Sequence, residues 1–589
     1  MRGADETMIW ARVVVGILLS CMAVPAPAVA KCSVGKYLEL PVTMVGNNPV
    51  VTIQINGRDA RFLLDSGAFF STIAKANAKD YGLPVKDLDN VRLTGIGGET
   101  SLGVVNAKEV TIGGYTFRKV DFAVGGSDTG FVGLLGQNLL GTADIEYDLP
   151  HAMVRIMKSD DCKTAGLAYW AHDRPYTMLP IKWSEGPKFT VASVTINGKT
   201  VDALFDSGAR TTIISRTAAK RIGVTPDSPG VREDGYVTGM GQKRVASWRA
   251  RFEAIDIGGE AIKRPILTIA DRLLGDTDML MGVDFFLTHR IYVDNKYHRM
   301  FVTYEGGSLF GLSPRGAVDE TGARLELISK AAEPVDAAGF SRRGALFATH
   351  GKRREAIADF DRAIAMAPGQ ADYVYQRARV RIDNDEPLLA AADLDKAITL
   401  APNDARARMA RATMRLMADD ETSALSDLKA ADAALAPTAD ARLALADQFA
   451  RAGDFEAALA NYQRWLAAHA EDVGRPSAFA GACWARAVLD RELDRALSDC
   501  NAALRLRRNT AEYLDSRALV RLRRGELDKA LADYDAVLAL APRSAWSLYA
   551  RSVAARRAGK AAQADADKAA AIAIDPHVAE RAKRYRIEP

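Results

Sequence analysis

Between residues 36 and 304 the chain alternates short apolar runs with polar turn residues. The runs are rich in Val, Ile, Thr and Phe, and the pairs Asn56-Gly57 and Asn197-Gly198 interrupt them. An Asn-Gly pair between alternating apolar segments predicts a β-hairpin. The pattern therefore predicts all-β structure, in units of about 120 residues that suit a small barrel or sandwich.

This region contains two copies of one unit. VTIQINGRDARFLLDSGAFFSTI aligns with ASVTINGKTVDALFDSGARTTII, which sets Asp65 opposite Asp206. GLLGQNLL at 133–140 likewise aligns with MLMGVDFF at 279–286. Self-similarity of this kind predicts a duplicated architecture. We expect lobe 1 at residues 36–160 and lobe 2 at residues 176–304.

After a linker at 305–336 that bears Gly, Pro and Ser, the chain becomes rich in alanine, arginine, leucine and aspartate. One alanine position recurs with intervals of 34, 34, 34, 38, 34 and 34 residues, at Ala356, Ala390, Ala424, Ala458, Ala496, Ala530 and Ala564. A period near 34 residues predicts helical hairpins that stack because none covers its own apolar face. The sequence thus predicts seven helical repeats over residues 337–580.

The beginning of the chain predicts export. Arg2 and Arg12 precede and flank the apolar run VVVGILLSCMAV, and PAPAVA ends at Ala30. This order is typical of a signal peptide, here residues 1–30, and places the protein in the periplasm or outside the cell. An alternative takes LLSC as a lipoprotein acylation box at Cys21. No later segment is long and apolar enough to predict a membrane span.

Composition argues against a nucleic-acid-binding function, and it does not decide whether the cysteines form disulfides. The 589 residues carry a net charge of +4, too small and dispersed for a nucleic-acid-binding surface. Removal of residues 1–30 leaves Cys32, Cys162, Cys483 and Cys500, an even number that an oxidising compartment permits to form disulfides. Buried free thiols are the alternative. Neither local pair has metal-ligand spacing, and we predict no metal and no cofactor.

Asp65 and Asp206 are the candidate chemical groups. A carboxylate at the end of an apolar strand is costly to bury unless hydrogen bonds satisfy it, and the Ser-Gly that follows offers a hydroxyl and backbone amides. One such triplet is an ordinary turn, whereas two in matching places suggest acids that meet across a pseudo-two-fold axis. Two carboxyls in contact separate their pKa values, which gives one acid and one base.

The motifs resemble the retropepsin-like aspartic peptidases. LLDSGA and LFDSGA, TGIGG at 94–98 and TGMGQ at 238–242, and GLLGQ and LMGVDFF follow that family's order in both copies. The resemblance implies that Asp65 and Asp206 form an intramolecular catalytic dyad. It also implies supporting roles for Ser66, Gly67, Ser207 and Gly208, and substrate-binding flap tips at Gly95, Ile96, Gly97, Gly98, Gly239, Met240 and Gly241.

The helical repeats resemble tetratricopeptide repeats, with a small residue at position 8, Ala at 20, an aromatic residue or Leu at 24 and Pro at 32. This resemblance implies a surface for a protein partner or substrate. It places Cys483 at position 7 and Cys500 at position 24 of one repeat, which face each other, so we expect a disulfide there. Cys32 and Cys162 flank lobe 1, and a bond between them would tie its ends together.

Together these features predict two all-β retropepsin-like lobes followed by an all-α solenoid. The expected function is that of an exported aspartic endopeptidase that cleaves peptide or protein substrates with an activated water. The alternative is a non-catalytic adaptor that binds peptides in the same cleft and recruits a partner through the repeats.

Overall fold

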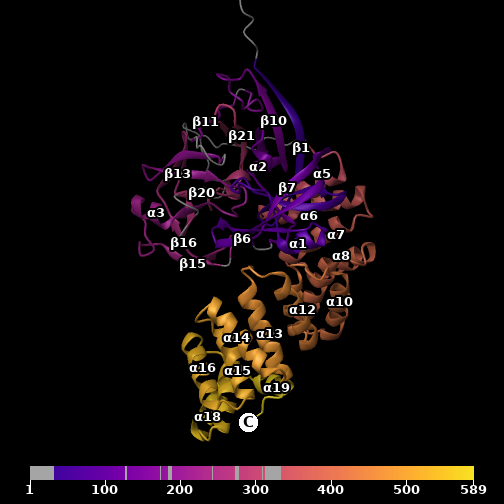
Figure 1. Cartoon of the computed structure of the whole chain (residues 1–589), viewed down its shortest axis with the longest axis vertical. Coiled ribbons are helices and arrows are strands. Elements are labelled where there is room, and N and C mark those ends of the chain that lie inside the picture. Colours follow the sequence, from indigo (N-terminus) through magenta and orange to yellow (C-terminus); the bar gives the residue numbers. More distant parts are fainter. Residues whose placement is uncertain are drawn as a thin grey trace, which may run out of the picture.

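The computed structural model describes residues 32–126, 129–172, 174–182, 189–239, 241, 243–271, 273, 277–307, 309–311 and 333–588. The expected signal peptide, the alternative lipid site at Cys21 and most of the linker lie outside these residues. Figure 1 shows a β-rich part, in indigo to magenta, from which a curved stack of helices extends. The predicted fold class, β lobes followed by a helical solenoid, is confirmed.

Lobe 1 is a β structure with a few short helices. Its strands are β1 (Ser33–Val45), β2 (Asn48–Ile55), β3 (Arg58–Leu64), β4 (Thr72–Ile73), β5 (Lys86–Gly95), β6 (Gly98–Ile112), β7 (Tyr115–Val124), β8 (Gly133–Leu135), β9 (Asp144–Asp148) and β10 (Met153–Asp160). Its helices are α1 (Lys75–Asp80), α2 (Gln137–Leu140) and a 3-10 turn at Leu149–His151. The Asn56-Gly57 hairpin forms as expected, and both residues have positive φ, as a type I′ turn requires.

Lobe 2 repeats this plan. Its strands are β11 (Thr177–Pro180), β12 (Val191–Ile196), β13 (Lys199–Phe205), β14 (Ile213–Ser215), β15 (Arg232–Val237), β16 (Val245–Arg251), β17 (Ala254–Ile257), β18 (Glu260–Lys263), β19 (Ile266–Ala270), β20 (Met279–Met281), β21 (His289–Asp294) and β22 (Arg299–Tyr304). Its helices are α3 (Arg216–Ile222) and α4 (Val283–Phe286). In each lobe the strand before the Asp-Ser-Gly loop pairs in parallel with the apolar-Gly strand, β3 with β8 and β13 with β20.

A sheet shared by the two lobes holds them together. Its strands run in the order β11-β22-β21-β9-β10-β1, and β9 of lobe 1 pairs antiparallel with β21 of lobe 2. Tyr147 lies opposite Ile291 and Ile145 opposite Val293, so the register is symmetric about the centre of the pair. The alternating apolar runs predicted the strands but not this continuous sheet.

The helical part consists of antiparallel hairpins. Its helices are α5 (Ala337–Thr349), α6 (Arg353–Met366), α7 (Ala371–Asp383), α8 (Pro387–Leu400), α9 (Ala405–Met417), α10 (Glu421–Ala434), α11 (Arg442–Arg451), α12 (Phe455–Ala468), α13 (Arg475–Leu489), α14 (Leu493–Leu506), α15 (Ala511–Arg523), α16 (Leu527–Leu540), α17 (Ala545–Arg557), α18 (Ala561–Ile574) and α19 (Val578–Arg584). The second helix of each of the seven hairpins α5/α6 to α17/α18 carries one recurring alanine, at most 2 % exposed. Small side chains there let neighbouring helices approach closely, as a tetratricopeptide-like solenoid requires.

Both expected disulfides are present in the structure. Cys32 is bonded to Cys162, which ties the start of β1 to the segment after β10. Cys483 on α13 is bonded to Cys500 on α14, within the fifth hairpin. In five other hairpins an arginine occupies the position of Cys483 and pairs with a buried aspartate, for example Arg377 with Asp393. In the fifth hairpin the disulfide takes the place of this arginine, while a second ion pair, Arg486 with Asp499, still connects the two helices.

The solenoid docks on lobe 1. α5 lies against β1, where Thr349 Oγ1 donates to the carbonyl of Gly46 at 2.9 Å. The loop after α10 approaches α1 through a hydrogen bond from Thr438 to Asp80. Figure 1 shows α5 and α6 beside the indigo strands of lobe 1. Ala345, Leu346 and Phe360 share one buried cluster with the β core, so the first hairpin and the lobes form a continuous interior.

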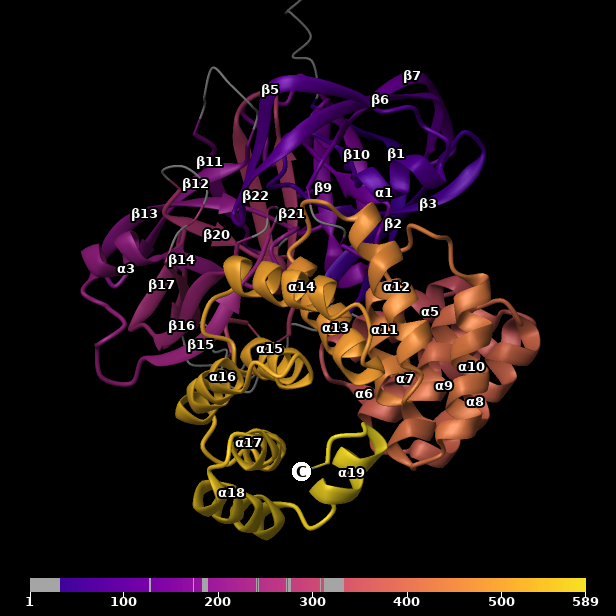
Figure 2. The same ribbon diagram turned by 60° about the horizontal axis from the view of Figure 1, so that its bottom comes forward.

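The last described segment turns back into the hollow of the solenoid, as Figure 2 shows for α19. The ring of Tyr585 lies 5.6 Å from Phe455, 6.0 Å from Trp484 and 5.6 Å from Trp546, centroid to centroid. Arg523 donates to the carbonyls of Tyr585 and Arg586, which satisfies acceptors at the end of α19. Among the described residues, no helix is both long and apolar enough to cross a bilayer.

Candidate active site

The two Asp-Ser-Gly loops begin in the same way. Asp65 follows β3 and its N–H donates to the carbonyl of Leu135 at 3.0 Å, whereas Asp206 follows β13 and its N–H donates to Met281 at 2.9 Å. Each loop then turns tightly, with Ala68 N–H donating to the Asp65 carbonyl and Ala209 N–H to that of Asp206. Because the apolar strands on both sides are buried, each loop is fixed at the end of a rigid parallel pair.

Ser66 and Ser207 lock the loops together by reciprocal hydrogen bonds. Ser66 N–H donates to Ser207 Oγ at 3.1 Å, and Ser207 N–H donates to Ser66 Oγ at 2.9 Å. Each hydroxyl then donates to a carbonyl of the other lobe, Ser66 Oγ to Phe205 at 2.8 Å and Ser207 Oγ to Leu64 at 3.0 Å. All four bonds are buried and cross the lobe boundary, so the loops have little freedom to move apart.

The carboxyl groups of Asp65 and Asp206 meet at this boundary. Asp65 Oδ1 accepts from the N–H groups of Gly67 and Ala68, at 3.0 and 2.8 Å. Asp206 Oδ1 accepts from those of Gly208 and Ala209, at 2.8 and 3.2 Å. The two side chains also share a hydrogen bond with each other. The sequence-predicted acids, 141 residues apart, are thus brought into direct contact.

Glycine is required where each loop passes the opposite acid. A Cβ on Gly67 would lie 2.5 Å from Asp206 Oδ1, and a Cβ on Gly208 would lie 2.5 Å from Asp65 Cγ. Real Cβ atoms do not approach so closely, so any larger residue would displace the carboxyl that it faces. The four supporting residues predicted from the sequence therefore all touch the pair of acids or its loops.

The environment raises the pKa of both acids. Burial is the main cause for each carboxyl, and at Asp65 the neighbouring Asp206 charge raises the pKa further. The shift is greater at Asp65, whereas three backbone N–H groups lower the pKa of Asp206 toward its ordinary value. The geometry therefore favours a proton on Asp65 and a negative charge on Asp206.

A second layer of polar residues, which the sequence reasoning missed, supports the loops from behind. Gly136 N–H donates to Ser71 Oγ, which donates to Asn138 Oδ1 at 2.8 Å. In lobe 2, Gly282 N–H donates to Thr212 Oγ1, which donates to Asp284 Oδ1 at 2.7 Å. The alignment of GLLGQNLL with MLMGVDFF already paired Asn138 with Asp284, a signal that could have found them.

Lobe 1 adds two polar groups that lobe 2 lacks. Gln137 Nε2 donates to the carbonyl of Ser66 at 2.9 Å, and the buried hydroxyl of Tyr147 lies beside both residues. Burial raises the pKa of Tyr147. Val283 of lobe 2 aligns with Gln137, so these additional polar groups beneath the acids come from lobe 1 alone.

The predicted flap tips meet each other. Residues 95–98 form the turn of the β5–β6 hairpin, and Lys243 N–H of lobe 2 donates to the carbonyl of Gly97 at 2.8 Å. Ile96 packs against an apolar cluster of lobe 2 that includes Leu204 and Ile213. A Cβ on Gly241 would clash with the backbone of Gly97, so the tips touch main chain to main chain. Met240, the remaining flap-tip prediction, lies outside the described residues.

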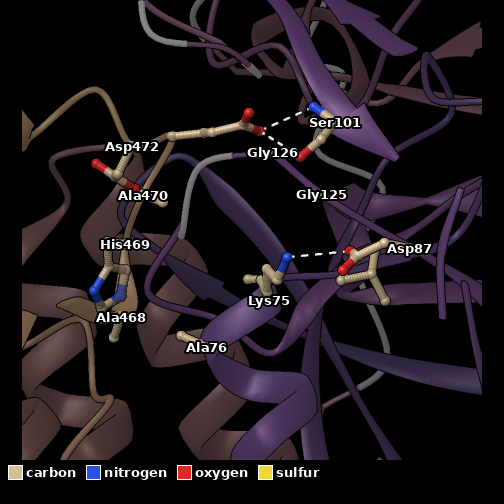
Figure 3. Close-up of a pocket in the computed structure, with 13 residues that line it drawn as sticks. Lys75, Ala76, Asp87, Ser101, Gly125, Gly126, Ala468, His469, Ala470 and Asp472 are labelled. Carbon is tan, nitrogen blue, oxygen red and sulfur yellow. Dashed lines mark hydrogen bonds and ion pairs between the residues drawn. The ribbon is translucent and has the colours of Figure 1, made fainter. Parts of the chain in front are cut away.

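A separate cavity of about 110 Å³ lies between lobe 1 and the solenoid, away from the acids. Glu471 lies on the loop between α12 and α13, and its Oε2 accepts from the N–H and Oγ of Ser101, both at 2.9 Å. Figure 3 shows Ser101 beside Ala470 and Asp472 of that loop. Lys75 pairs with Asp87 at 3.1 Å on the opposite wall. Because Ser101 lies on β6, this contact connects the repeats to the strand that carries the lobe 1 flap.

One family model matches a segment of each β lobe. Residues 51–139 and 192–285 each match the family model described as aspartyl protease. The chain carries two aspartyl-protease-like domains. The retropepsin-like resemblance of the sequence is thereby confirmed, and both matches of the aspartyl protease model include an Asp-Ser-Gly loop. A search of curated proteins returned no match.

Several solved structures similar to part of the chain are described as tetratricopeptide repeat proteins. YrrB, described as having an unusual peptide-binding site, is 20% identical with a TM-score of 0.29 and covers 33% of this chain and 97% of its own. PilW, a type IV pilus biogenesis factor, is 16% identical with a TM-score of 0.30, covering 35% and 94%. A repeat protein from Cytophaga hutchinsonii is 15% identical with a TM-score of 0.30, covering 41% and 98%.

Proposed function

We propose that the protein is an exported aspartic endopeptidase whose intramolecular Asp65/Asp206 dyad activates a water to hydrolyse peptide bonds. One observation carries the proposal: two acids from duplicated loops touch across a boundary fixed by reciprocal serine hydrogen bonds. The aspartyl protease match over both lobes supports it. A non-catalytic cleft has no need for two carboxyls in contact, because burying them together costs stability.

The proposed reaction assigns different roles to the two acids. Asp206, as the carboxylate, accepts a proton from water while the water oxygen attacks the carbonyl carbon of the substrate. Asp65 donates its proton to the carbonyl oxygen, which gives a neutral tetrahedral intermediate. Collapse breaks the C–N bond, the amine leaves with a proton from Asp206, and Asp65 regains its own. The flap hairpins cover the site and exclude bulk water during these steps.

The test is cleavage of an unfolded protein substrate by wild type and by Asp65→Asn and Asp206→Asn. General acid and general base catalysis each contribute about 10²–10⁴-fold, so we expect at least a 10²-fold loss in either variant. Asp121→Asn, on β7 of lobe 1, is the matched control and retains activity. If either dyad variant retains wild-type activity, the shared-dyad mechanism is wrong.

We further propose that the solenoid binds a protein partner or the substrate. Its curved stack of hairpins offers an extended surface, and the contact of Glu471 with Ser101 connects the repeats to the strand that carries the lobe 1 flap. Tyr585 already fills one part of the hollow, so a ligand at that end must displace it. Copurification of partners with the full chain, and their loss after substitution of exposed solenoid residues, tests this proposal.

Export is supported by the two disulfides, which persist in oxidising compartments. We expect the mature protein to begin at Lys31, immediately before Cys32. Amino-terminal sequencing of protein from the periplasm or medium checks this expectation. A mature chain that begins at a lipid-modified Cys21 would instead establish the lipoprotein alternative.

A further inference from the structure

The pseudo-two-fold axis of the dyad relates two contacts that differ in chemistry. Four residues after each acid, Phe69 of lobe 1 aligns with Arg210 of lobe 2, at the offset of 141 that also relates Asp65 to Asp206. Each of these residues crosses to the other lobe. Phe69 contacts Phe189, with ring centroids 6.5 Å apart, and Arg210 Nε donates to Asn48 Oδ1 at 3.2 Å.

The partners are also symmetry mates, because Asn48 and Phe189 differ by the same 141 positions. The two contacts therefore occupy equivalent places on opposite sides of the dyad. On one side three aromatic rings gather, since Phe69 also packs edge to face on Phe70 at 4.6 Å. On the other side the equivalent positions hold an arginine and an asparagine.

Both sides remain accessible next to the loops that hold the acids. Phe70 is 43% exposed, a large value for an aromatic ring beside a buried site. Arg210 is exposed, and among the described residues no carboxylate pairs with its guanidinium. The exposed ring of Phe70 can pack against an apolar group of a ligand. Arg210 uses Nε to donate to Asn48, so its other guanidinium N–H groups can pair with an anion of a ligand.

We propose that this asymmetry fixes the direction and the class of peptide that the cleft accepts. The side chain on one side of the bond at the dyad is large and apolar or aromatic, and it packs on Phe69 and Phe70. A side chain on the other side is acidic and pairs with Arg210. The inference deepens the proposed function by naming the substrate class of the same site.

The experiment compares peptides that differ only at these two positions. One set carries Phe on one side of the central bond and Glu on the other, in both orders; control peptides replace Phe by Ala or Glu by Gln. We measure kcat/KM with wild type and map the cleaved bond. We measure binding to Asp206→Asn by fluorescence anisotropy.

We expect one of the two orders to be preferred. Loss of the aromatic ring reduces kcat/KM or affinity about tenfold or more, because a buried ring contributes hydrophobic free energy. Loss of the acidic group costs up to about fivefold, as for an ion pair near the surface. Equal results for the two orders would overturn the inference.

Charge reversal gives the sharper test. Arg210→Glu should reverse the preference from Glu to Lys at the same peptide position, and Phe69→Arg should remove the aromatic preference. Lys220→Glu, on the exposed face of α3, is the matched control and leaves both preferences unchanged. An acidic preference that survives Arg210→Glu contradicts the assignment of this residue.

The two readouts separate this inference from the proposed function. If wild type and Asp206→Asn bind one order of Phe and Glu more tightly but wild type does not cleave the peptide, the peptidase proposal is refuted and the proposed peptide class is supported. Cleavage that ignores both side chains would support the peptidase and refute the peptide class. Neither binding nor cleavage of any peptide would overturn both.

Discussion

The two lobes agree closely at the dyad and differ around it. The reciprocal bonds of Ser66 and Ser207 have the same form in both directions, and the glycine that follows each serine passes equally close to the opposite acid. One layer away the copies diverge, because Asn138 of lobe 1 occupies the position that Asp284 occupies in lobe 2. The comparison shows that the two lobes are nearly identical in the loops that hold the two carboxyls and differ in the residues behind these loops.

The largest expected effect comes from Gly67→Ala or Gly208→Ala. Because the new Cβ would displace the facing carboxyl, we expect either variant to lose at least about 10²-fold in kcat/KM, the cost of misplacing a catalytic group by about 1 Å. Peptide cleavage assays measure the loss. Similar losses support functional equality of the two loops, whereas a tolerated Gly208→Ala would show that the lobe 2 loop can relax and the lobe 1 loop cannot.

Removal of a loop hydroxyl should weaken the lobe boundary. Ser66→Ala leaves the Phe205 carbonyl and the Ser207 N–H buried without a partner, and Ser207→Ala does the same to Leu64 and Ser66. We expect a loss of about 2 kcal/mol in the free energy of unfolding for each variant. Urea denaturation measures it, and Ser→Thr at the same position, which retains the hydroxyl, is the control. A clear difference between the two variants would contradict the symmetry of the bonds.

The pH dependence should reveal the difference between the two acids. Burial and the Asp206 charge raise the pKa of Asp65, so its proton is present at low pH and is lost as the pH rises through that value. In the proposed mechanism the active dyad carries one proton, on Asp65. We therefore expect kcat/KM to fall about tenfold per pH unit once the pH exceeds the pKa of Asp65. A profile of kcat/KM against pH checks this. Full activity far into the alkaline range would contradict a protonated Asp65.

The smallest effect is expected from exchanging the second-layer residues. Burial raises the pKa of Asp284, so its contribution to stability is full below the unfolded pKa and is lost as the pH rises through the folded value. Asp284→Asn, which gives lobe 2 the residue of lobe 1, should change stability by about 1 kcal/mol or less and flatten its pH dependence. Urea midpoints at acidic and neutral pH measure both. Asn138→Asp is the reciprocal variant and should introduce the same dependence.

The contact between Asp65 and Asp206 could be predicted because its sequence signal is local and occurs twice. Asp65 and Asp206 lie in matching motifs, and the pairing of the lobes follows from duplication. The periodic alanines similarly predicted the helical hairpins, and the repeat register placed Cys483 beside Cys500. In these cases a short motif or a fixed spacing carries the physical requirement.

Features set by long-range contact could not be predicted in this way. The pairing of β9 with β21 depends on the register between strands about 145 residues apart, and alternation along one strand does not specify its neighbour. Glu471 and Thr438 dock on lobe 1 from loops, which have no periodicity. Tyr585 reaches its aromatic neighbours only because the solenoid curves, a property of the stacked repeats as a whole.

The strand pair at the lobe junction limits how a substrate of the proposed activity could enter. Because β9 and β21 hydrogen-bond to each other, the lobes cannot hinge apart without breaking a buried ladder, and the floor beneath the acids stays closed. Entry from the side of the flaps instead requires separating the two loop tips, which touch through the hydrogen bond from Lys243 N–H to the Gly97 carbonyl and through the packing of Ile96. Under the proposed function, a polypeptide substrate would enter by lifting two loop tips, so we expect extended chains to enter more readily than folded domains.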